Sequence, residues 1–250
     1  MSRAMEKYLR PGLKGTPFCP GCGHGILMNS LLRAIDSLKM DMEKMVFVSG
    51  IGCAAWIPSP HFKADTLHTL HGRAIAFATG VKLYKPDLTV VVVSGDGDLS
   101  SIGGNHLIHA ARRNIDLKVI CANNMVYGMT GGQVASTTPR GAKTSTTGAG
   151  NPYRPFDLCR LARAAGATYV ARYSVTQPVA LINSLQKVLQ HTGFSFIDVI
   201  SPCPTQFGRR NRQGKPEEMI QDLIRISIRK EEAEQLSEEE LSGKIVTGEF

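Results

Sequence analysis

A run of four valines, Val90–Val93, constrains the fold of this chain more than any other feature. A strand that is hydrophobic at every position has no solvent-facing side. It is therefore expected inside a parallel sheet that is covered by helices on both faces. The run ends at Ser94 and Gly95 and is followed by two carboxylates, Asp96 and Asp98. A buried strand that ends in a glycine-rich acidic turn indicates a binding site at the end of that strand.

Strands and helices are predicted to alternate along most of the chain. The hydrophobic pattern indicates strands over 44–50, 88–95, 117–123, 168–173 and 194–201, and helices over 71–84, 100–113, 156–165 and 177–190. Such alternation is typical of right-handed βαβ units and of parallel sheets. We therefore expect an α/β domain over residues 1–214, with a parallel sheet and helices on both faces. Residues 215–250 are expected to form a charged helical extension.

The charge is distributed unevenly between these two parts. Residues 215–250 hold 5 basic and 10 acidic residues, so they carry −5, and residues 1–214 carry +13 of the net charge of +8. The basic part favours acidic ligands or partners, but it lacks the Lys/Arg clusters with interleaved aromatic residues of a nucleic-acid surface. The apolar runs are too short to cross a bilayer, and no secretory signal is visible. We expect no nucleic acid, no membrane, and a cytoplasmic location.

Polar residues follow two successive predicted strands. Asp96 comes after the valine strand, and Asn124 follows the next strand along the chain. If the two strands are neighbours, both side chains face one crevice, because ligands of open parallel sheets bind beyond the carboxyl ends of the strands. A carboxylate, an amide oxygen and a free backbone carbonyl suit Mg²⁺ that also contacts a phosphate. The alternative interpretation of "GDGD" is a tight turn without a ligand.

The segment 127–153 is long and rich in Gly, Ser and Thr, with few apolar residues. Compact domains rarely keep such a loop unless it binds something or is disordered. Both alternatives remain open from the segment alone.

Four of the six cysteines lie in polar turns, and they are Cys19, Cys22, Cys53 and Cys203. The first two form a C-x₂-C pair, and each of the other two follows a predicted strand. Their spacing leaves three alternatives open, which are a [4Fe–4S] cluster, a zinc ion, or free thiols. Cys121 and Cys159 lie within a predicted strand and a predicted helix, and we interpret them as packing residues.

Taken together, these motifs resemble the β subunits of 2-oxoacid:ferredoxin oxidoreductases. The segments "FCPGCGHG", "SGIGC", "HTLHGRAIAFATGVKL", "GDGD", "NNMVYGMTGGQ" and "SPCPTQFG" occur here over residues 17–210 in the order found in that family. The chain is most similar to enzymes that act on 2-oxoglutarate. The resemblance implies the diphosphate-binding fold of thiamine diphosphate enzymes. It also implies oxidative decarboxylation of a 2-oxo acid with coenzyme A to acyl-CoA and CO₂, with electrons passing to ferredoxin.

The resemblance implies roles for individual residues. Mg²⁺ is expected at Asp96, Asn124 and the Val126 carbonyl, and one [4Fe–4S] cluster at Cys19, Cys22, Cys53 and Cys203. Contacts to thiamine diphosphate are expected from Gly52, Cys53, His71, Gly72, Arg73, Gly95, Asp96, Gly97, Asp98, Asn124, Val126, Tyr127, Gly128, Met129 and Thr130. His71 is the candidate catalytic residue, and Asn123 and Asp98 are expected to buttress the metal site. A structural ion pair is the alternative role for Arg73. No role is assigned to His24 or Trp56.

The chain has room for only one of the two domains that normally enclose thiamine diphosphate. An α subunit that binds the pyrimidine ring and coenzyme A is therefore expected to supply the activating glutamate. Small ferredoxin-like subunits and ferredoxin are further expected partners. Alternative substrates are pyruvate and branched or aryl 2-oxo acids. Alternative functions are a non-redox thiamine decarboxylase subunit and a non-catalytic zinc or nucleic-acid binding module.

Overall fold

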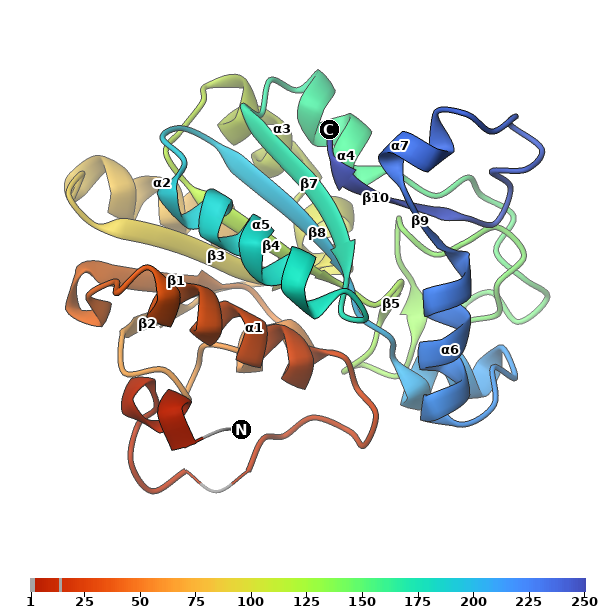
Figure 1. Ribbon diagram of the computed structural model, residues 1–250, viewed down its shortest axis with the longest axis horizontal. Coiled ribbons are helices and arrows are strands. Elements are labelled where there is room, and N and C mark those ends of the chain that lie inside the picture. The colour runs from red at the N-terminus through yellow and green to blue at the C-terminus, as the bar shows by residue number, and fades with distance from the viewer. Residues whose placement is uncertain (1–2, 14) are drawn as a thin grey trace.

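The computed structural model describes residues 3–13 and 15–250. Within that range the main sheet has eight strands in the order β2-β1-β3-β4-β8-β7-β10-β9 (Figure 1). Its strands are β1 (Met45–Ser49), β2 (Asp65–His68), β3 (Thr89–Gly95), β4 (Lys118–Asn123), β7 (Tyr169–Ser174), β8 (Ser195–Ile200), β9 (Ser227–Arg229) and β10 (Ile245–Glu249). Neighbouring strands run parallel except β7 and β10, which are antiparallel. A separate hairpin joins β5 (Val126–Tyr127) to β6 (Gln133–Val134).

The valine strand lies inside the sheet, as its sequence predicts. β3 is paired with β1 on one side and with β4 on the other, and all four valines are fully buried. Val91 and Val93 pack into the core on one face, while Val90 and Val92 pack into the core on the other. Each face of the strand therefore removes apolar side chains from water, which explains the absence of polar alternation.

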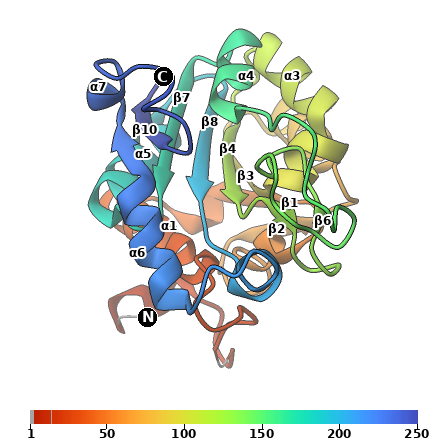
Figure 2. The same cartoon turned by 90° about the vertical axis from the view of Figure 1, so that its right-hand side faces the viewer.

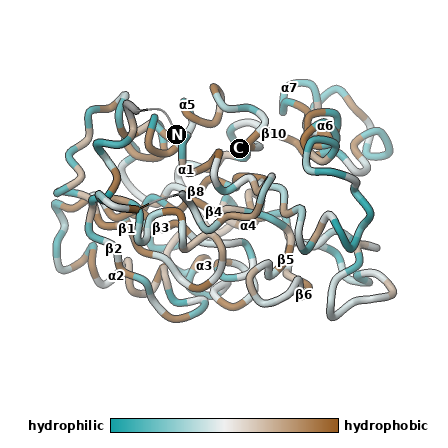
Figure 3. Tube along the Cα trace, turned by 90° about the horizontal axis from the view of Figure 1, so that it is seen from below, coloured by the Kyte–Doolittle hydropathy of each residue, from teal (hydrophilic) through white to brown (hydrophobic). Residues whose placement is uncertain are grey.

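Helices cover both faces of the sheet, so the structure has three layers (Figure 3). One face packs against α1 (His24–Ser37) and α5 (Pro178–Gln190), and the other against α2 (Ala74–Tyr84), α3 (Gly104–Arg112) and α4 (Leu158–Ala164). This confirms the expected α/β fold. In the described part of the chain, no helix has the length and apolarity needed to cross a membrane.

Two differences from the sequence prediction concern helices. The helix α1 was not predicted, although it buries a stripe of apolar side chains against α5. The helix expected over 100–113 begins instead as a wide helical turn, η4 (Gly97–Ile102), and α3 follows it. The chain therefore starts to coil directly after Asp96, and Asp98 lies in this first turn.

The prediction of a helical C-terminal extension is correct only in part. The segment contains α6 (Pro216–Ile226) and α7 (Lys230–Ala233), but β9 and β10 extend the sheet beyond β7. The hydroxyl of Thr247 is buried; it donates to the Ile228 carbonyl at 3.0 Å and accepts from Gln177 Nε2 at 3.1 Å. The high charge of the segment favoured a helix in the sequence interpretation, whereas pairing with the open edge of β7 decides its actual structure.

Removing the Thr247 hydroxyl tests whether β10 is an integral part of the sheet. Thr247→Val leaves the half-buried Gln177 amide without its acceptor, so we expect a loss of about 1–2 kcal/mol in the free energy of unfolding. Thermal melts should show a Tm lower by roughly 2–6 °C. The control is Thr89→Val at the start of β3, because Thr89 makes no side-chain hydrogen bond within the described residues. Equal melts for the two variants would contradict the account.

Candidate active site

Five adjacent strands each end in a segment that the sequence analysis singled out. The carboxyl ends of β2, β1, β3, β4 and β8 lie along one edge of the sheet (Figure 2). The residues that follow these strands, in the same order, are His71, Cys53, Asp96, Asn124 and Cys203. In-register parallel pairing keeps these ends level, since Gly95 is paired with Ala122 and Asn123 with Ile200. The order of strands in space therefore assembles the site.

A pocket at this edge is lined by all of the expected cofactor contacts except Gly72 and Arg73. His24, Ile51 and Ala54 complete its wall. Gly72 and Arg73 are not part of this lining. The Arg73 guanidinium donates to the Gly72 carbonyl at 3.1 Å and, within the described residues, forms no ion pair. The structural ion pair considered for Arg73 is therefore not present among these residues.

Asp96 is a buried carboxylate with only neutral partners. Its side chain is 1% exposed, it accepts a hydrogen bond from the Asn124 amide N–H at 3.2 Å, and the Thr137 hydroxyl donates to its other oxygen. None of the ion pairs in the described chain includes it. Burial raises the pKa of Asp96 to about 7, and these hydrogen bonds offset the effect only partly. Such a group favours a nearby cation.

Asp98 is equally buried, but it is fully engaged by donors from three segments. It accepts hydrogen bonds from the amides of Ile51 and Gly72 at 3.2 and 2.7 Å and from the Ser94 hydroxyl at 2.6 Å. His71 Nδ1 also donates to it. Asp98 thus ties together the turns after β1, β2 and β3 and fixes the ring of His71. Because Nδ1 carries the proton, Nε2 is the ring nitrogen of His71 that is left to accept one.

The two asparagines after β4 have different roles. The side-chain oxygen of Asn124 accepts from the Val126 amide at 3.2 Å, which shapes the turn around the pocket. Asn123 faces away from this pocket and donates to Asp198 at 3.0 Å. Asp198 in turn pairs with Arg172 at 2.9 Å. These charged groups line a second cavity of about 670 Å³ between the sheet edge and α6. The expected role of Asn123 in supporting a metal site stays a prediction.

The polar segment after β4 is a packed structure, not a free loop. Thr138 donates to the Met125 carbonyl at 2.6 Å, and Asn151 donates to the Thr138 carbonyl at 2.8 Å. Both side chains are buried. The segment is therefore pinned across the ends of the strands, where it brings Thr137 to Asp96. Sequence analysis missed Thr137, because nothing distinguishes it from the other threonines of the segment.

The cysteine segments adjoin the acidic turn. A Cβ placed on Gly128 would lie 3.3 Å from Asn124 Nδ2, 3.5 Å from Cys53 Sγ and 3.8 Å from Cys203 Sγ. The two sulfurs therefore flank the same small space beside Asn124, and only a glycine leaves that space open.

The C-x₂-C loop reaches the same place from the N-terminal side. The amide of Gly23 donates to the Pro202 carbonyl at 3.1 Å, and His24 Nδ1 is 2.8 Å from the Ser201 hydroxyl. Burial, with the neighbouring Cys203, Cys53 and Cys19, raises the pKa of Cys22 to about 12. The pKa of Cys53 rises to about 11, mainly through burial. Thiolates in such a position need a cation to neutralise them.

His24 and Trp56 can now be placed. His24 is buried at the start of α1, and burial lowers its pKa to about 4, so the imidazole is neutral at pH 7. It joins the cysteine loop to the segment before Cys203. Trp56 is 40% exposed and lies outside the lining of the pocket, so it is not a core residue. Thr130 is exposed, and its hydroxyl donates to Gln133 at 2.7 Å.

Within residues 3–13 and 15–250, no three His, Cys, Asp or Glu side chains converge closely enough to hold a single metal ion. Neither the expected magnesium ion nor the expected iron–sulfur cluster requires three such side chains at one point. The magnesium set contains one carboxylate together with amide and carbonyl oxygens. In an iron–sulfur cube each thiolate binds a different iron, so the sulfurs surround the cluster without meeting at one point. The remaining two cysteines, Cys121 and Cys159, are buried in the core, as predicted.

The chain is similar in sequence to known proteins. A family model described as "Thiamine pyrophosphate enzyme, C-terminal TPP binding domain" matches residues 50–199. The chain is 54% identical over 244 residues to the 2-oxoglutarate synthase subunit KorB of Methanocaldococcus jannaschii, covering 98% of this chain and 90% of that protein. It is 44% identical over 191 residues to a 2-oxoacid:ferredoxin oxidoreductase subunit beta of Sulfolobus, covering 75% and 62% of the two chains.

A solved structure of similar fold is the 2-oxoglutarate:ferredoxin oxidoreductase of Magnetococcus marinus with 2-oxoglutarate, coenzyme A and succinyl-CoA bound. It superposes with a TM-score of 0.84 at 32% identity, covering 98% of this chain and 83% of that chain.

The same substitution at the two aspartates should have opposite effects on stability. Asp96 has a raised pKa in the folded chain, so its ionisation destabilises the fold increasingly as pH rises from about 4 to about 7. At pH 8, Asp96→Asn should therefore raise the free energy of unfolding of the metal-free chain by about 2 kcal/mol. Asp98→Asn weakens several charge-assisted hydrogen bonds and should lower it by about 1–2 kcal/mol.

Thermal melts of both variants at pH 6 and pH 8, without metal or cofactor, measure this difference. The gain for Asp96→Asn should be larger at pH 8 than at pH 6. A destabilised Asp96→Asn chain at both values would show that the buried carboxylate is not strained.

Proposed function

Because this chain belongs to the β subunits of the 2-oxoacid:ferredoxin oxidoreductases, we propose that it holds thiamine diphosphate, Mg²⁺ and one [4Fe–4S] cluster for the oxidative decarboxylation of 2-oxoglutarate. Members of this family are enzymes that work as complexes. The products are succinyl-CoA and CO₂, and the electrons pass through the cluster to ferredoxin. The KorB relatives and the Magnetococcus marinus enzyme support 2-oxoglutarate as the substrate.

The observation that carries the proposal is the buried carboxylate of Asp96 at the end of β3. It has neutral hydrogen-bond partners and a pKa raised to about 7, so a bound cation would restore its ionised form. Asp96, the side-chain oxygen of Asn124 and the carbonyl of Val126 are hard oxygen ligands suited to Mg²⁺. Gly97 and Gly128 line the same pocket, so their backbone can approach a bound diphosphate there. The residues present therefore fit the metal and the cofactor.

The cysteines fit the cluster. The four cysteines approach from three loops, and the half-buried thiols of Cys22 and Cys53 have raised pKa values without a cation. Iron ligation deprotonates such thiols. Only a small space beside Gly128 separates Cys53 Sγ from the Asn124 side chain. This proximity supports a cluster beside the cofactor. Electrons then have only a short distance to travel.

Thiamine diphosphate, when bound, supplies the carbon nucleophile that adds to a 2-oxo acid and accepts the electron pair left by decarboxylation. This chain's own residues position that chemistry. Asp96 and Asn124 would hold the diphosphate through the metal, and the pinned segment brings Thr137 to Asp96. Asp98 fixes the His71 ring against the edge of Tyr127, with a distance of 5.7 Å between ring centroids. His71 Nε2 is then available to hold a proton at the pocket.

The activating glutamate is expected from another subunit. Within the described chain, the acidic residues that line the pocket are Asp96 and Asp98. Asp98 accepts hydrogen bonds from the surrounding turns, and Asp96 is the proposed metal ligand. We therefore propose that an α subunit supplies this carboxylate together with the sites for the pyrimidine ring and coenzyme A. The isolated chain is expected to bind its cofactors without turning over substrate.

Two substitutions should separate the metal–diphosphate site from the cluster. Asp96→Asn should weaken Mg²⁺-dependent retention of thiamine diphosphate by more than about tenfold, because it removes the charged ligand, while iron content stays unchanged. Cys203→Ser should do the reverse. Anaerobic purification, followed by iron analysis and equilibrium dialysis with labelled cofactor, measures both quantities.

Cys159→Ala is the matched control, because Cys159 is a buried cysteine outside the site and should leave both quantities unchanged. Equal loss of iron and of thiamine diphosphate in each of the two site variants would mean that they unfold the edge of the sheet, and would argue against two separable sites.

A further inference from the structure

A cluster of positive charge lies next to the cysteines and has no role in the proposed site. Within the short segment 209–215 the side chains of four cations are exposed, and a fifth lies on the neighbouring loop. They are Arg209, Arg210, Arg212, Lys215 and Lys143, and we call them the basic patch. None of the ion pairs found in the described residues involves any member of the patch. Unneutralised cations gathered on one surface favour an anionic partner.

The patch is attached to the cysteine loops at both of its ends. The segment begins at Cys203, continues through the turn η5 (Pro204–Gly208) and returns at Pro216. A Cβ on Gly21 would lie 2.3 Å from Pro216 Cβ and 3.3 Å from Pro204 Cγ, so the C-x₂-C loop packs directly on both ends. Figure 2 shows these segments together below the carboxyl ends of the strands. The four cations of segment 209–215 therefore lie between Pro204 and Pro216, the two residues that contact the C-x₂-C loop.

Hydrogen bonds hold the patch in place. Arg210 donates to the Gly131 carbonyl at 3.0 Å, and Asn211 exchanges hydrogen bonds with the backbone of Lys143 at 2.8 and 3.0 Å. These hydrogen bonds fix the patch against the segment that follows β4. Cys19 is itself exposed, and its C-x₂-C loop packs on both ends of the segment that carries the patch. A partner seated on the patch would approach the thiol of Cys19 from solvent.

We propose that the basic patch is the docking surface for an acidic protein that carries single electrons. The inference rests on the proposed function, since it assumes a cluster at the four cysteines. Electron-carrier complexes use small, weak interfaces in which charge guides the encounter. Electron transfer weakens steeply with distance, so a carrier is useful only at the surface nearest the cluster. The patch supplies the charge at that surface.

The test uses the complete complex of this chain with its partner subunits, assayed with 2-oxoglutarate and coenzyme A. The acceptors are methyl viologen and a purified small ferredoxin of strongly negative net charge. Arg209→Glu with Arg212→Glu should raise the KM for ferredoxin about tenfold at low ionic strength. Added salt should shrink the difference, because it screens the charges. Turnover with methyl viologen and iron content should stay at the wild-type values.

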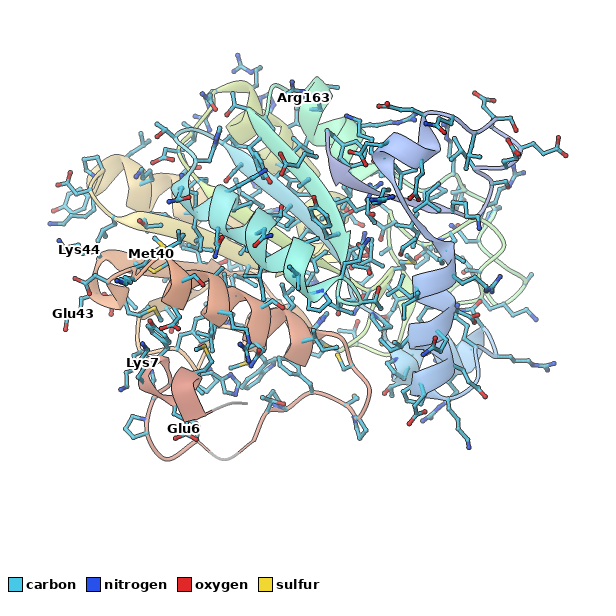
Figure 4. The ribbon with its side chains drawn as sticks, in the orientation of Figure 1. Glu6, Lys7, Met40, Glu43, Lys44 and Arg163 are labelled. Atoms are coloured by element: carbon cyan, nitrogen blue, oxygen red, sulfur yellow. The ribbon has the colours of Figure 1, made fainter. Side chains whose placement is uncertain are left out.

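The matched control is Lys44→Glu with Arg112→Glu. Lys44 lies before β1 at the opposite end of the sheet (Figure 4), and Arg112 ends α3 there. Both are exposed. This control makes the same change in net charge and should leave the KM for ferredoxin unchanged.

Three results would overturn the inference alone. The first is an equal KM for ferredoxin in the patch variant and the control. The second is loss of a partner subunit from the patch variant in gel filtration, which would assign the surface to assembly. The third is a raised KM for coenzyme A with normal ferredoxin reduction. A wild-type complex that reduces neither acceptor with any 2-oxo acid would overturn the proposed function and, with it, the inference.

Discussion

The site depends on one constraint, which is that neighbouring parallel strands end at the same edge of a sheet. Five adjacent strands, in the order β2-β1-β3-β4-β8, deliver their following turns to that edge. Hydrogen bonds that the Asp98 carboxylate accepts then join the turns after β1, β2 and β3. The chain can therefore bring together residues from 19 to 203 without a dedicated site domain. The same level edge places the proposed metal site next to the proposed cluster.

Burial of Asp96 links stability to function. The carboxylate occupies a position where neutral hydrogen-bond donors stabilise it only partly, and its pKa is raised to about 7. A fold selected for stability alone would carry a neutral residue there. Buried carboxylates without a charged partner concentrate at functional sites, because a bound ligand or metal supplies the opposite charge. Asp98, two residues later, has the same side chain and all of its partners inside the chain.

The sequence predicted the parts of the fold that depend on local patterns. Val90–Val93 predicted a doubly buried strand, and the alternation of elements predicted the three layers. The family resemblance, carried by the motifs around these turns, implied most of the residues that line the pocket. The missed features depend on tertiary contacts. Thr137 becomes relevant only because its segment folds back over β3, and β10 forms because the edge of β7 is open to it. The sums of charge over 1–214 and 215–250 divide the basic patch between them, so neither sum indicates it.

The central claim is that a metal-held diphosphate and an iron–sulfur cluster lie side by side at this edge. Electron paramagnetic resonance of the reduced cluster, in the complete complex loaded with thiamine diphosphate and with Mn²⁺ in place of Mg²⁺, tests it most directly. A paramagnetic ion at Asp96 should accelerate the spin relaxation of a neighbouring cluster relative to the magnesium-loaded complex. Identical relaxation in the two complexes, with Mn²⁺ stoichiometrically bound, would contradict the account.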